Sequence, residues 1–284
     1  MASFSAMAGC WFRQVLPGSS ARTALRKVPE LTAFFWVTKA LINGSSEWWP
    51  DYLYGRFGLV AVTGVLAALL AAALALQFSV RRYHASIYWL TFAVASVAAK
   101  EAANGLHRVG LPYVVVAVFW LVVLAVILVA WRASGERMSA GSVCAGRQEV
   151  FYWSAVGSAF ALSQALGHAS VEFGFTYLRG ELALVAALTV VVAVAWWRFG
   201  LSPVPAFWLA FVLTYPLGGG LASWLAAARN TGGLGLGRWP VSMSLAIAAV
   251  GLVVYMAATG REAWPAQVGS GPAGRRIRFR ARSQ

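Results

Sequence analysis

The pattern that decides the fold is clearest in residues 88–104, which read YWLTFAVASVAAKEAAN. An aromatic residue and a tryptophan open this apolar stretch, and the polar residue Asn104 follows fifteen positions after the tryptophan. The arrangement occurs four times, with the pairs Phe35-Trp36, Tyr88-Trp89, Tyr152-Trp153 and Phe207-Trp208 and the polar positions Asp51, Asn104, His168 and Ser223. Repetition of this kind indicates a duplicated unit, and polar residues inside apolar helices are candidate functional residues.

The composition is that of a membrane protein. Hydrophobic residues make up 60% of the 284 residues and charged residues 11%, whereas an ordinary soluble domain is about 25% charged. Apolar runs of about 20 residues, enough for a helix to cross a bilayer, lie at about 29–49, 57–78, 86–107, 111–131, 150–171, 181–198, 203–226 and 239–259. We therefore expect an all-α, polytopic membrane protein with eight transmembrane helices.

Each repeat should contain two of these helices, a first one with the aromatic pair and the polar position and a plain apolar second one. The repeats cover about 28–80, 81–133, 147–199 and 200–260, and basic tails at 1–27 and 261–284 flank this membrane domain. An even number of crossings gives every repeat the same orientation, so an axis along the membrane normal should relate them. The first helix of each repeat would then line the centre.

The net charge of +14 does not indicate nucleic-acid binding. If the first helix enters from the cytoplasm, most Lys and Arg residues fall in cytoplasmic segments, which is the positive-inside pattern. We expect a multi-pass protein of the bacterial inner membrane with both termini in the cytoplasm and the lipid bilayer as its main partner.

The chain resembles a family of bacterial membrane-anchored proteins built from four copies of a two-helix repeat of unknown function. The similarity spans residues 27–259, and the motifs that carry it include Lys27-Val28-Pro29-Glu30-Leu31-Thr32, Phe35-Trp36, Asp51-Tyr52-Leu53, Tyr88-Trp89-Leu90-Thr91, Phe151-Tyr152-Trp153, Arg198-Phe199-Gly200-Leu201, Ala206-Phe207-Trp208, Pro216-Leu217-Gly218 and the glycine-rich segment 232–237. The resemblance implies an aspartate at the polar position of every repeat. Here only Asp51 is kept, and Tyr215 replaces an arginine. Four carboxylates suit a cation or proton path. One carboxylate with an asparagine, a histidine and a serine is a weaker and softer set of ligands.

Glu47 and Asp51 are four residues apart and share a helix face, where two carboxylates can clamp a cation or share a proton. Against this, Trp48-Trp49-Pro50 lies between them, and Pro50 is expected to kink or end the helix. Asp51 would then be a wetted residue at the outer interface. Both interpretations stay open.

Two lysines lie inside predicted helices. Lys39 has no polar counterpart in the other repeats and needs a carboxylate, backbone carbonyls or water as partner. Lys100 occupies the position that Glu47 holds in the first repeat, eleven after the tryptophan. Equal depth on neighbouring helices predicts a Glu47–Lys100 ion pair with charged ends within about 4 Å, either structural or part of a substrate relay. Glu101 is turned about 100° away.

In the third repeat, Gln164 takes the Glu47 position, and His168 and Glu172 are four residues apart. His168 is either a hydrogen-bonded packing residue or a ligand, while His84 and His107 fit interfacial positions. In the fourth repeat, Gly218-Gly219-Gly220 after Pro216 permits close helix approach or a break in the helix.

No catalytic triad, metalloprotease or kinase motif occurs, so we expect no enzyme, and the sequence indicates no cofactor and no defined metal site. The leading interpretation is a transporter-like protein for a small ion or solute, with Glu47, Asp51, Asn104, His168 and Ser223 as candidate ligands. Lys39, Lys100, Glu101, Gln164 and Glu172 would support them. The alternative is a non-transporting scaffold or regulatory subunit with a degenerate site, which associates with itself or with a family relative.

The topology makes a direct prediction. A reporter that is active only in the periplasm should be silent when fused after Gln284 and active when inserted near Asn230, because the two positions lie on opposite sides of the membrane. The opposite pattern of activity would contradict both the orientation and the number of crossings.

Overall fold

The computed structural model is all-α over the residues that it describes, which are 27–135, 143, 146–174, 203–259 and the single positions 190, 194 and 198, except for the side chains at 50, 51, 203 and 215–217. Its α-helices are α3 (Ala33–Ser45), α4 (Trp49–Phe57), α5 (Leu59–Ser79), α6 (Ala85–Arg108), α7 (Tyr113–Ala133), α8 (Arg147–Glu172), α10 (Pro203–Tyr215), α11 (Leu221–Ala226) and α12 (Arg238–Thr259). A π-helical turn, η2 (Pro216–Gly220), joins α10 to α11, and a short 3-10 turn, η3 (Arg229–Thr231), precedes α12.

Four of the described helical segments are long and apolar enough to cross a membrane: Leu59–Ser79, Tyr113–Ala133, Val204–Ala226 and Arg238–Thr259. The expectation of eight such spans is therefore met only in part. The helices α6 and α8 are long enough, but they carry buried polar residues such as Lys100 and Gln164. The predicted span at 181–198 lies outside the described residues, apart from single positions.

The first predicted span is interrupted. The helix α3 ends at Ser45, and the chain enters α4 at Trp49, with Pro50 in the first turn. Proline is tolerated there because the first N–H groups of a helix have no intrahelical partner. The expected effect of Pro50 on the helix is confirmed, and α3 is 13 residues long instead of a full span.

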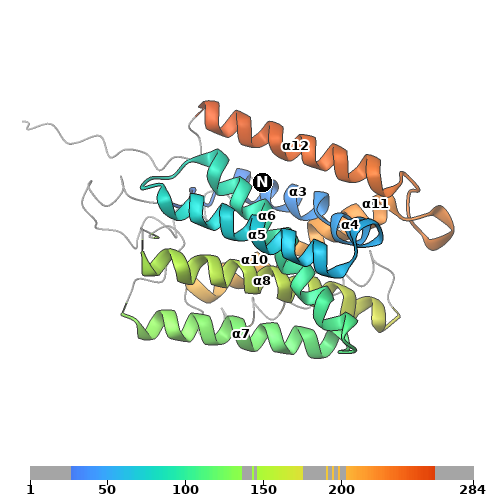
Figure 1. Cartoon of the computed structure of the whole chain (residues 1–284), viewed down its shortest axis with the longest axis horizontal. Coiled ribbons are helices and arrows are strands. Elements are labelled where there is room, and N and C mark those ends of the chain that lie inside the picture. Colours follow the sequence, from blue (N-terminus) through green and yellow to red (C-terminus); the bar gives the residue numbers. More distant parts are fainter. Residues whose placement is uncertain are drawn as a thin grey trace, which may run out of the picture.

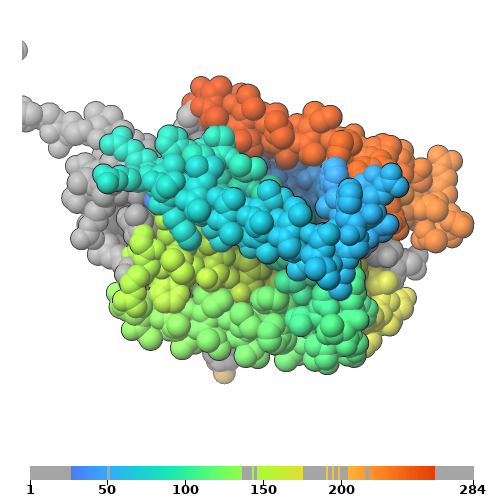
Figure 2. Space-filling model, in the orientation of Figure 1, coloured from blue at the N-terminus to red at the C-terminus, as the bar shows by residue number. Residues whose placement is uncertain are grey.

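The helices α5, α7, α8 and α12 run roughly along the long axis of the molecule, and α6 crosses it obliquely (Figure 1). The second helix of a repeat packs against the first helix of the next repeat: α5 on α6, α7 on α8, and α12 back on α3. The helices α5, α7 and α12 form much of the face seen in Figure 2, and large apolar side chains such as Val60, Val129 and Ile247 are exposed on them. This leaves α3, α6, α8 and α10 inside.

The four aromatic-tryptophan pairs meet in a closed ring, which we call the aromatic layer. In each case the first aromatic residue of one pair contacts the tryptophan of the next pair along the chain, and the last pair contacts the first. The ring centroids are 5.6 Å apart for Phe35–Trp89, 5.5 Å for Tyr88–Trp153, 6.3 Å for Tyr152–Trp208 and 6.0 Å for Phe207–Trp36. The interplanar angles are 44°, 47°, 49° and 51°, so one contact geometry recurs around the axis of the bundle.

A hydrogen-bonded group at the aromatic end of the bundle corrects one expectation. Lys27, assigned above to the basic tail, is 1% exposed. Its Nζ donates to Oε2 of Glu149 at 2.5 Å and to the carbonyls of Gln77 and Phe78 at 3.3 Å, at the end of α5. The amide of Gln77 donates to Oε1 of the same carboxylate at 3.0 Å. Lys27 therefore belongs to the folded core, where it caps the carboxyl end of α5.

Of the two alternatives expected from the glycines of the fourth repeat, the structure shows the close helix approach, and the helix stays continuous through the π-helical turn η2. The π-helical turn η2 begins at Pro216, and a Cβ added at Gly218 would lie 2.4 Å from the carbonyl oxygen of Ala40 in α3. A Cβ at Gly44 would likewise lie 2.9 Å from the carbonyl oxygen of Gly218. The two backbones can touch only because both positions are glycine.

This contact predicts that Gly218→Ala destabilises the protein by roughly 1–3 kcal/mol, since the new methyl group would meet backbone that cannot move aside. Thermal unfolding in detergent measures the effect. Gly64→Ala in α5, where a Cβ would have nothing within 4 Å, is the matched control and should not lower the midpoint. Equal midpoints for the two variants would contradict the close approach.

Candidate functional site

A cavity of about 240 Å³ opens at the end of the bundle opposite the aromatic layer. Three of the four polar positions, Asn104, His168 and Ser223, contribute to its lining, each from a different helix. The other lining residues are Glu47, Trp48, His107, Arg108, Tyr113, Gln164 and Arg238. The side chain of Asp51, the fourth polar position, lies outside the described residues. The equal spacing from the tryptophans thus brings residues far apart in the chain to one site.

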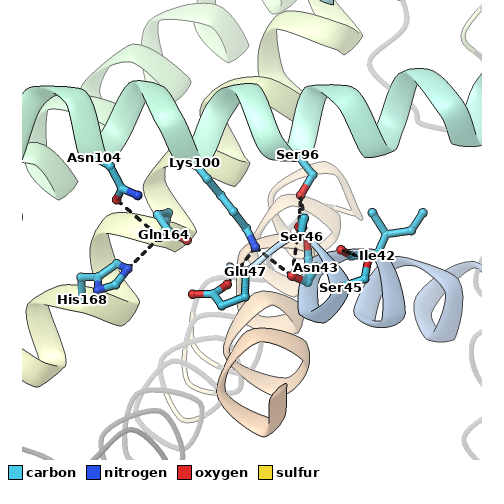
Figure 3. A network of polar contacts seen from close by, with 10 residues as sticks. All are labelled: Ile42, Asn43, Ser45, Ser46, Glu47, Ser96, Lys100, Asn104, Gln164 and His168. Atoms are coloured by element: carbon cyan, nitrogen blue, oxygen red, sulfur yellow. Dashed lines mark hydrogen bonds and ion pairs between the residues drawn. The ribbon is translucent and has the colours of Figure 1, made fainter. Parts of the chain in front are cut away.

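Hydrogen bonds fix the polar positions of α6 and α8 (Figure 3). The amide nitrogen of Gln164 lies 2.7 Å from Nε2 of His168 and donates to Oδ1 of Asn104 at 3.5 Å. The hydroxyl of Tyr113 donates to the same Asn104 oxygen at 3.2 Å, and its ring stacks on His168 with centroids 4.7 Å apart. His168 is therefore a hydrogen-bonded residue in the cavity wall, and its role as a ligand stays a prediction.

The predicted Glu47–Lys100 ion pair is confirmed. Nζ of Lys100 lies 2.8 Å from Oε2 of Glu47, with side chains 1% and 9% exposed. Lys100 also donates to the carbonyl oxygen of Asn43 at 2.8 Å, near the end of α3 (Figure 3). A cation favours this position because the last carbonyls of a helix carry partial negative charge.

The remaining acidic candidates serve neighbouring groups. Glu101 points away from the ion pair, as its position on the helix predicts, and accepts from Nη1 of Arg108 at 3.0 Å. Glu172 accepts from the backbone N–H of Tyr113 at 3.1 Å and so caps the start of α7. Its Oε1 also lies 3.8 Å from Nδ1 of His107. Glu172 thus stabilises the cavity wall without lining the cavity.

The partner that Lys39 requires is a backbone carbonyl. Its Nζ donates to the carbonyl oxygen of Phe211 at 2.8 Å, and the side chain is completely buried. The amine also lies 4.2 Å from the centroid of the Phe211 ring and 5.5 Å from that of Phe160. A carbonyl and two aromatic faces give a buried amine partial compensation for its lost hydration.

The π-helical turn at Pro216 explains why a side chain of α8 donates a hydrogen bond to the backbone of α10. Pro216 has no N–H, so the carbonyl of Val212 lacks the donor that a regular helix would supply four residues later. The hydroxyl of Ser163 in α8 donates to that carbonyl at 3.3 Å. Side chains of α3 and α8, Lys39 and Ser163, therefore donate to the carbonyls of α10 next to Pro216.

Three phenylalanines separate the cavity from the aromatic layer. The centroids of Phe92 and Phe160 are 4.9 Å apart, those of Phe160 and Phe211 5.2 Å, and those of Phe92 and Phe211 5.9 Å. All three side chains are fully buried. This phenylalanine triangle and Lys39 form a fully buried layer that does not line the cavity.

Five lining residues escaped prediction: Trp48, His107, Arg108, Tyr113 and Arg238. His107 was expected at the interface, yet its ring stacks on Tyr113 with centroids 3.9 Å apart. These residues lie at helix ends, where no repeat spacing marks them. In the part of the chain that the structure describes, no group of three or more His, Cys, Asp or Glu side chains is placed to hold a metal ion.

The ion pair predicts a non-additive stability effect. Glu47→Gln or Lys100→Gln alone should destabilise the protein by about 3–5 kcal/mol, because each leaves one charge without its partner in a poorly hydrated site. The double substitution should recover much of that loss, since no charge then remains. A double-mutant cycle of unfolding midpoints measures the coupling, and additive losses would show that the two groups act independently.

No family model, curated protein or solved structure matches this chain. The family resemblance of the repeats therefore stays a prediction that rests on the sequence motifs alone.

Proposed function

We propose that the chain is an eight-span membrane transporter in which a small ion or polar solute binds in the polar cavity, between α3, α6, α8 and the π-bulged helix α10–η2–α11. Both termini would lie in the cytoplasm of a bacterial cell, and the cavity would open to the opposite side. The convergence of Asn104, His168 and Ser223 on one cavity carries this proposal.

The distribution of polarity supports eight spans. The outer helices α5, α7 and α12 are apolar and exposed, as lipid contact requires. In α6 and α8 the polar residues face other helices, where a membrane protein can satisfy them. Together with α3–α4, the segment 181–198 and the π-bulged helix, these elements supply four two-helix repeats.

The arrangement along the inner helices supports a transport role. One end is open, and further along the inner helices the phenylalanine triangle and the aromatic layer fill the interior with buried side chains. A π-helical turn inside an α-helix frequently marks a functional site, and η2 is such a turn. A scaffold or regulatory subunit would need none of these polar groups to converge, and it is the interpretation that remains if nothing binds.

The test is flux and binding in proteoliposomes, with protons, divalent cations and small anions as probes. His168→Ala should abolish or strongly reduce binding and flux of the accepted probe, because it removes a wall of the cavity and a partner of Gln164. His84→Ala, an exposed histidine outside the cavity, is the matched control and should leave both unchanged. Asp51→Asn tests the polar position whose side chain is not described. Binding and flux that none of these cavity substitutions changes, or their complete absence, would contradict the proposal.

A further inference from the structure

The charges of the cavity wall do not cancel. Glu47 is held by Lys100 at 2.8 Å, and Arg108 is held by Glu101 at 3.0 Å. The remaining charged side chain of the described lining is Arg238, which has no carboxylate partner among the described residues and lies over the ring of Trp48 at 4.1 Å. Over the described side chains, the wall and its ion-pair partners therefore carry an excess positive charge.

A hydrogen-bond donor lies next to this guanidinium. Nε1 of Trp48 is buried and has no acceptor within the described part of the chain. An unpaired buried N–H is unfavourable, and an acceptor oxygen would remove that penalty once a small shift of the indole ring brought the N–H to the cavity surface. A cation could not satisfy this donor.

Trp48 and Arg238 each lie at the amino end of a helix. Trp48 is the N-cap of α4, with no side-chain cap, and Arg238 is the first residue of α12, which is 22 residues long. The amino end of a helix carries partial positive charge and unpaired N–H groups, and both features favour anions. The guanidinium, the indole N–H and the two helix ends all favour a ligand of the same sign.

The volume limits the size of the ligand. The cavity volume is about 240 Å³. The cavity is thus smaller than the roughly 300–1,000 Å³ of pockets for drug-sized ligands.

We infer that the cavity binds a small oxyanion, such as a short carboxylate or inorganic phosphate, at Arg238 and Trp48. This inference rests on the proposed function and narrows its substrate class. It departs from the cation path that four aspartates would serve, in keeping with their replacement by Asn104, His168 and Ser223.

The experiment measures thermal unfolding of the purified full-length chain in detergent at fixed ionic strength. Sodium acetate and sodium phosphate are titrated against sodium chloride, and magnesium chloride tests for cations. At least one oxyanion should raise the midpoint progressively with concentration, as a ligand specific for the folded state does. Arg238→Gln should weaken its apparent affinity at least tenfold, as expected for a charged hydrogen bond. Trp48→Phe, which keeps the aromatic face, should weaken it about two- to tenfold.

Arg56→Gln is the matched control, since Arg56 lies in the last turn of α4 and does not line the cavity, and it should bind like the unchanged protein. Arg238→Lys keeps the charge and should retain part of the affinity, which separates loss of binding from loss of folding. Stabilisation by magnesium that disappears in Asp51→Asn or His168→Ala would overturn the oxyanion assignment while leaving the proposed function in place. Stabilisation by no probe would overturn the assignment, and absence of any flux in proteoliposomes would remove the proposed function as well.

Discussion

The contact between the first aromatic residue of one repeat and the tryptophan of the next fixes the arrangement of the inner helices. Four such contacts, with centroids 5.5–6.3 Å apart, close a ring at one end of the bundle. Because all four are made by the same two positions of the repeat, the inner helices start at one height. Residues equally far from their tryptophans then reach equal depth, about 1.5 Å further for each residue. The Glu47–Lys100 pair and the convergence of Asn104, His168 and Ser223 both follow from this alignment.

The polar groups of the interior are satisfied in ways that depend on helix ends. Lys39 and Ser163 donate to carbonyls in the last turn of α10, beside the π-helical turn at Pro216, and Lys100 donates to a carbonyl near the end of α3. At the aromatic end, Lys27 does the same for α5. A regular helix offers few free carbonyls. The end of α3 and the π-helical turn after α10 therefore provide the acceptors that these buried side chains need.

Part of the cavity wall lies at the junction of α3 and α4 and at the start of α12. The helix α3 stops at Ser45, and α4 restarts with Trp48 as its N-cap, which puts an indole and a helix amino end beside Glu47. The first residue of α12, Arg238, closes the same wall, and its guanidinium covers Trp48 at 4.1 Å. Aligned inner helices thus supply the neutral polar floor of the site, while helix ends supply its positive charge. The lining therefore combines neutral polar groups from the inner helices with charged groups at helix ends.

The sequence by itself determined the helical class, the inner and outer roles of the helices, the end of α3 before Pro50 and the Glu47–Lys100 pair. All of these follow from features within one repeat, namely apolar length, proline chemistry and the distance from a tryptophan. The prediction of eight spans was met only in part, since the inner helices α6 and α8 contain buried polar residues and are less apolar than the outer helices. Only the tertiary structure decided that a backbone carbonyl partners Lys39, that Lys27 is buried, and that Trp48, His107, Arg108, Tyr113 and Arg238 line the cavity. These contacts join helix ends or non-equivalent positions in different repeats, and their partners are set by how the helices pack, which no spacing along the chain records.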